Sequence, residues 1–111
     1  MPPVSSASLS SRERTHLKSL AHALEPIVQI GSQGITPTVI AALGVALDDH
    51  ELVKVRLGQS FDGDRHAASK ELAVASDSTL VQVIGRIIVL FKARSKKRQE
   101  ARTRPQIELP R

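Results

Sequence analysis

The residues best suited to chemistry in this chain form a short turn between two glycines. The turn follows an apolar run at 27–30 and precedes Thr36-Pro37, a pair typical of the start of a helix. Main-chain amides in such a turn, with the amides and dipole of a helix N-terminus, favour an anion. A strand-to-helix turn can also use glycines for conformational reasons alone. We predict phosphate contacts at Gly31, Ser32, Gln33 and Gly34.

Positive charge is concentrated toward the end of the sequence. Residues 86–111 carry nine Lys or Arg and two Glu, whereas residues 1–85 carry seven basic and nine acidic side chains. A basic segment beside a near-neutral body favours an anionic partner such as a nucleic acid, and a solubilising tail is the alternative. The candidate contacts in this region are Arg86, Lys92, Arg94, Lys96, Lys97 and Arg98.

Three further basic candidates lie on predicted regular elements. Alternation in residues 52–57 places Lys54 and Arg56 on the strand face opposite Val53, Val55 and Leu57. Three interpretations of that face remain open: it contacts a nucleic acid, it is exposed to solvent, or a helix packs on it. On the first helix we expect Lys18 to share the polar surface with Arg14.

Composition argues against several classes of function. Phe61 and Phe91 are the only aromatics, so base recognition by an aromatic platform is disfavoured, and backbone and shape readout is expected instead. Cysteine is absent, which excludes disulfides and thiolate metal sites. His16 and His22 lack metal-ligand spacing, and the turn lacks the Lys-Ser/Thr of a P-loop. We predict a protein that is not an enzyme, with no metal, cofactor or small-molecule substrate.

The sequence also lacks an apolar segment suited to a membrane. The first residues do not read as a signal peptide, and no apolar run approaches the roughly 20 residues needed to span a bilayer. We therefore expect a cytoplasmic protein without a membrane partner, and a monomer.

The helical segments are predicted from capping residues and apolar spacing. Ser10 and Glu13 fit a capping box, and Pro26 ends that first helix, whose apolar face is Leu17, Leu20, Ala21 and Leu24. A second helix is expected at 37–49, where Gly44 costs stability unless a close contact requires it. A third is expected at 65–75, capped by Asp62 or Asp64, with Ala68, Leu72 and Ala75 inward.

Strands are predicted at 27–30, 52–57, 79–84 and 87–92, the last two joined by a type II′ turn at Gly85-Arg86. The element order α-β-α-β-α-β-β indicates one compact α/β domain. We expect a four-stranded mixed sheet with helices packed on it, combining parallel pairs with one antiparallel hairpin. The predicted organisation is a disordered N-terminus at 1–8, a domain at 9–92 and a basic tail at 93–111.

Several separated motifs, in order, resemble the bacterial YhbY-type RNA-binding proteins, whose module is the CRM (chloroplast RNA splicing and ribosome maturation) domain. The motifs are His16-Leu17-Lys18, Leu20-Ala21-His22, Leu24, Pro26, the 31–34 turn, His50-Glu51-Leu52-Val53-Lys54-Val55, Val81-Gln82-Val83-Ile84-Gly85, Val89-Leu90 and the final Ile107, Leu109-Pro110-Arg111. The sequence departs from the family at Phe91-Lys92, where members often have Tyr-Arg, and at Ser76-Asp77-Ser78, which replaces a Thr-Gly-Gly-like turn.

The resemblance implies a fold like the C-terminal domain of translation initiation factor 3, and binding of structured RNA. In bacteria it further implies association with precursors of the large ribosomal subunit. It assigns the family's GxxG loop to residues 31–34 and its basic surface to Lys18, Lys54 and Arg86. We therefore expect a non-enzymatic ribosome assembly factor that binds rRNA of the large-subunit precursor. An architectural DNA-binding protein and a protein-interaction module of an RNA-processing complex are the alternatives.

Overall fold

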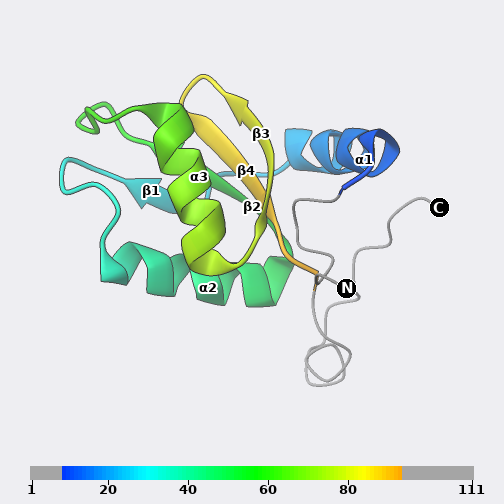
Figure 1. The fold of residues 1–111 in the computed structure, drawn as a ribbon, viewed down its shortest axis with the longest axis horizontal. Coiled ribbons are helices and arrows are strands. Elements are labelled where there is room, and N and C mark those ends of the chain that lie inside the picture. Colours follow the sequence, from blue (N-terminus) through cyan, green and yellow to red (C-terminus); the bar gives the residue numbers. More distant parts are fainter. Residues whose placement is uncertain (1–8, 94–111) are drawn as a thin grey trace.

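The computed structural model describes residues 9–93, which form three helices and four strands (Figure 1). In chain order these are α1 (Ser11–His22), β1 (Val28–Ile30), α2 (Pro37–His50), β2 (Leu52–Leu57), α3 (Arg65–Ser76), β3 (Thr79–Ile84) and β4 (Ile87–Phe91). The predicted α/β class and element order are confirmed. The N-terminus at 1–8 and the basic tail from Arg94 onward, which we predicted from sequence, lie outside the described residues.

Local signals explain where the helices begin. The Ser10 hydroxyl accepts a hydrogen bond from the Glu13 amide, and the Glu13 carboxylate accepts one from the Ser10 amide, which completes the capping box of α1. Thr36 caps α2 by accepting from the Val39 amide, with Pro37 at the first helical position. Asp64, rather than Asp62, caps α3.

The sheet has the order β1-β2-β4-β3 and a single parallel pair, β1 with β2. The expectation of several parallel pairs was wrong, because β4 lies between β2 and β3 and is antiparallel to both. Gly85, with φ of 56°, forms the β3–β4 turn with Arg86, and the signs of φ at the two positions are those of a type II′ turn.

Helices cover both faces of the sheet. On one face, α2 and α3 enclose the larger core, which includes Leu43, Leu47, Leu72 and the inward residues of β2. On the other face, Leu17 and Ala21 of α1 pack on Leu52, Val81, Val89 and Phe91. This cluster runs from Leu52 and Phe91, at the end of the sheet away from the hairpin, to Val81 and Val89 near its middle, and Arg56 toward the hairpin is exposed.

Two predicted apolar faces differ from the observed ones. On α3 the buried set is Ala68, Ser69, Leu72 and Ser76, and Ala75 is exposed. The Ser76 hydroxyl donates to the Leu72 carbonyl and bonds the Ser78 hydroxyl, which lets a polar residue occupy the inward position. Leu20 of α1 and Leu24, which follows the helix, are about 40% exposed, whereas Leu17 and Ala21 are buried against the sheet.

Candidate nucleic-acid interface

Three loops meet at the end of the sheet away from α1 (Figure 1). They are the connection from β1 to α2 at 31–36, the connection from β2 to α3 at 58–64, and the hairpin turn at 85–86. Since β1 and β2 are parallel, both of their carboxyl ends lie here. In open α/β sheets, ligands bind outside the carboxyl ends of the strands. We call these three segments the loop end.

The 31–34 segment is a hydrogen-bonded β-turn. The Gly34 amide donates to the Gly31 carbonyl at 3.0 Å, and the two residues between them, Ser32 and Gln33, are exposed. Gly34 has φ of 72°, a conformation that an L side chain adopts only with strain. The turn therefore places Ser32 and Gln33 at the surface.

The helix starts contribute less than the sequence suggested. In α2, Pro37 has no amide and the Val39 amide is bonded by Thr36, so the cap uses part of the anion-binding capacity of this terminus. In α3, the Asp64 carboxylate accepts from the amides of His66 and Ala67, so this helix start already holds a negative charge. The 31–34 turn is thus a better candidate for phosphate binding than either helix start.

Hydrogen bonds tie the three loops together. Gly58 donates through its amide to the Ile30 carbonyl at 2.8 Å, and Leu57 donates to the Arg86 carbonyl at 2.7 Å. The Arg86 guanidinium donates to the carbonyl of Gly58 at 2.9 Å and to that of Phe61 at 3.5 Å. Arg65 donates to the Gly85 carbonyl at 3.2 Å. Arg86, predicted as a candidate RNA contact, therefore has a structural role, and its position keeps a positive charge at the loop end.

Two residues not predicted from the sequence adjoin the turn. A Cβ atom at Gly31 would lie 3.6 Å from the Ser60 hydroxyl, which places Ser60 beside the turn. The Gln29 side chain reaches Gly58 and lies opposite Arg56 in the β1–β2 register. As the polar residue within an apolar strand, Gln29 could have been found from its pattern, whereas Ser60 is brought near only by the packing of two loops.

The remaining predicted basic residues are spread along the molecule. Arg56 is exposed and lies beside Ile87, near the hairpin. The Lys54 ammonium donates to the Leu24 carbonyl at 3.0 Å, midway along the sheet. Lys18 is exposed on α1, and Lys92 donates to the Ser76 carbonyl at 3.4 Å; both belong to the opposite end from the 31–34 turn. The predicted contacts Arg94, Lys96, Lys97 and Arg98 lie outside the described residues.

Arg14 differs from its predicted position on the solvent side of α1. Its guanidinium donates to the carbonyls of Leu80 and Val81 at 2.7 and 2.8 Å. The β3–β4 register shifts between Leu80 and Gln82, and such an irregularity leaves ladder carbonyls without strand partners. Arg14 is three residues before Leu17, so it lies on the side of α1 that packs on the sheet.

Between Leu9 and Ala93, no group of three or more His, Cys, Asp or Glu residues is arranged to hold a metal ion. Within the same part of the chain, no helix combines the length and the apolar character that crossing a membrane requires.

Comparison with known families identifies the domain. The model of the CRS1/YhbY (CRM) domain family matches residues 9–92. The chain belongs to this family. Two relatives carry the name of probable RNA-binding protein. The one from Bacillus subtilis is 37% identical over 92% of this chain and 99% of the relative, and the one from Pseudomonas aeruginosa is 38% identical over 79% of this chain and 85% of the relative.

A solved structure supports the fold. The solution structure of a hypothetical protein from Staphylococcus aureus, SAV1595, superposes on this CRM-domain protein with a TM-score of 0.72 and 38% identity. The match covers 93% of this chain and all of the other one. The architecture described above is therefore shared with that protein.

Proposed function

We propose that this CRM-domain protein is a non-enzymatic RNA-binding protein that holds structured RNA at the loop end. The observation that carries the proposal is the hydrogen-bonded turn at 31–34, whose two exposed residues, Ser32 and Gln33, lie at the carboxyl end of a parallel strand pair. Its family membership and the RNA-binding relatives support RNA as the ligand.

The mechanism is capture of the RNA backbone by the domain. Amides of Ser32 and Gln33 donate to a phosphate of the RNA. The exposed side chain of Arg56, on β2, attracts the adjoining part of the RNA backbone. Lys54, Lys18 and the basic residues at 92–98 extend the positive charge for a longer RNA. Because the described domain has only two aromatics, recognition relies on shape and backbone.

We further propose that the RNA is rRNA in the precursor of the large ribosomal subunit, and that the protein assists its assembly. The support is the resemblance of the separated motifs to YhbY-type bacterial proteins. A compact domain that reads shape and backbone suits folded rRNA, whose double-helical segments are recognised mainly through shape and phosphates.

Sedimentation of a lysate tests this target. The tagged protein, expressed in bacterial cells, is expected to migrate with free large subunits or their precursors, and to move to the top of the gradient after treatment with ribonuclease. Deoxyribonuclease serves as the control and should change nothing. Association that survives ribonuclease would contradict the proposal and favour a protein partner, and loss with deoxyribonuclease alone would favour DNA.

A further inference from the structure

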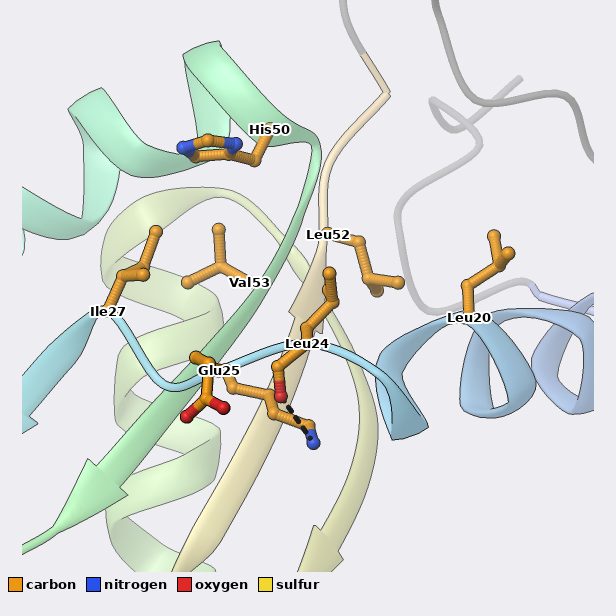
Figure 2. A pocket seen from close by; sticks show the side chains of 8 residues that line it. Leu20, Leu24, Glu25, Ile27, His50, Leu52 and Val53 are labelled. Atoms are coloured by element: carbon orange, nitrogen blue, oxygen red, sulfur yellow. Dashed lines mark hydrogen bonds between the residues drawn. The ribbon is translucent and has the colours of Figure 1, made fainter.

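An apolar groove of about 430 Å³ lies beside the end of α2 and the start of β2 (Figure 2), the ends of these two elements that are away from the loop end (Figure 1). It is bordered by the end of α1, the segment leading to β1, the end of α2 and the start of β2. Leu20, Leu24, Ile27, Leu52 and Val53 form its apolar lining. Glu25, His50 and Lys54 give it a polar rim.

The groove exposes aliphatic side chains that the rest of the domain leaves uncovered. Leu20 and Leu24 are about 40% exposed and Ile27 is 52% exposed, although all three belong to apolar patterns in the sequence. Two hydrogen bonds join the 24–27 segment of the groove to β2. Lys54 donates to the Leu24 carbonyl at 3.0 Å, and the Ile27 amide donates to the Lys54 carbonyl at 3.2 Å. A fixed apolar hollow of this size fits aliphatic side chains of a peptide segment.

The described chain ends beside this groove. Phe91, the last residue of β4, is the register partner of Leu52, which lines the groove, and the Lys92 amide donates to the Glu51 carbonyl at 2.9 Å. Thirteen residues, 94–106, then separate the domain from Ile107. Extended, they span up to roughly 43 Å, which exceeds the 38 Å longest dimension of the molecule, so Ile107 can reach the groove.

The chemistry of residues 107–110 suits the groove. Residues 94–106 are mostly Lys, Arg and other polar residues, whereas Ile107, Leu109 and Pro110 are apolar. In an extended segment Ile107 and Leu109 face one side and Glu108 the other, so the two aliphatic side chains can face the lining while Glu108 stays on the solvent side, above a rim that carries both Glu25 and Lys54. We propose that residues 107–110 occupy this groove, with Ile107 and Leu109 inserted among Leu20, Leu24 and Ile27.

This docking makes residues 94–106 a closed loop that holds six Lys and Arg side chains against the domain. In so far as the proposed function holds, such a loop presents basic residues to RNA at a lower cost in conformational entropy than an untethered tail. The docking itself requires no RNA, so its test is independent of RNA binding.

Disulfide trapping in the full chain tests the proposal. Because the native sequence has no cysteine, only the introduced thiols can react. Glu25→Cys on the rim is paired with Glu108→Cys, which leaves the apolar lining and the inserted side chains intact. Under mild oxidation at low protein concentration, we expect the intramolecular disulfide to form at least about tenfold faster than in a control pairing Glu108→Cys with Val74→Cys, because docking raises the local concentration of the two thiols. Val74 is 82% exposed on α3, away from the groove.

Adding Ile107→Ser and Leu109→Ser to the Glu25→Cys, Glu108→Cys chain should lower its rate to that of the control. Equal rates for the two cysteine pairs, or no effect of the serine substitutions, would overturn the proposal. Disulfides formed between molecules rather than within one would overturn it in favour of a second copy. Circular dichroism of each variant establishes that the fold is intact.

Discussion

At the scale of single residues, the basic side chains divide by what they touch. Arg14, Arg86 and Lys54 donate to main-chain carbonyls of neighbouring segments, whereas Lys18 and Arg56 are exposed. Charge and periodicity alone do not separate these groups, because the carbonyls that accept the bonds come from distant parts of the sequence. Arg14 was therefore misplaced on the solvent side.

Arg14→Ala is expected to lower the free energy of unfolding by about 1–2 kcal/mol, since the carbonyls of Leu80 and Val81 both lose their charged donor in a partly buried place. Lys18→Ala, one helical turn later and exposed, should change the free energy of unfolding by no more than about 0.5 kcal/mol. Urea unfolding of both variants measures the difference. Equal losses would show that the Arg14 bonds do not stabilise the irregular β3–β4 pairing.

At the scale of elements, Gly44 lies within α2 without a structural reason. A Cβ atom there would meet no heavy atom within 4 Å outside its own helix, so the close helix–sheet contact that could have required glycine does not exist. Gly44→Ala should therefore raise the free energy of unfolding by about 0.5–1 kcal/mol, through helix propensity.

Gly58→Ala is the matched control for Gly44→Ala. Its new Cβ would lie 3.2 Å from the Ile30 carbonyl oxygen, which already accepts the Gly58 amide. This variant should gain nothing or lose stability, as measured by thermal unfolding. A gain at Gly58 together with none at Gly44 would contradict the assignment of the two glycines.

The helices and strands were predictable because their ends depend on local chemistry. Ser10, Thr36 and Asp64 bond amides within three residues of themselves, and Gly85 supplies the turn conformation for the hairpin. The inward position of Ser76 was not predictable in the same way, since it depends on hydrogen bonds to Leu72 and Ser78 that relieve the cost of burial. Strand order likewise depends on pairing over long sequence separations.

At the scale of the whole molecule, two regions lie at opposite ends of the sheet. The loop end gathers the 31–34 turn with the 58–64 loop and the hairpin, and the apolar groove lies beside the last described residues. The sequence identified the turn through its glycines and helix start. It could not show that Ser60 adjoins the turn or that Leu20, Leu24 and Ile27 share a groove, since each grouping arises from tertiary packing.

The choice of substitution for a test of the loop end follows from the backbone. Gly34 is unsuitable, because its φ of 72° strains any replacement. Gly31 accepts a side chain, since its Cβ would meet only the Ser60 hydroxyl at an ordinary distance of 3.6 Å. Val74→Asp serves as the control, because it changes the net charge by the same amount at an exposed position of α3 outside the loop end.

The most direct measurement is the affinity of wild type, Gly31→Asp and Val74→Asp for one structured RNA over a range of salt concentrations. A carboxylate beside the bound phosphate should weaken binding by about tenfold in Gly31→Asp, whereas Val74→Asp should stay within about twofold of wild type. Wild-type affinity should fall with salt, with a log–log slope of roughly 0.7–0.9 per neutralised phosphate. Equal affinities of the two folded variants, or a flat response to salt, would contradict RNA capture at the loop end.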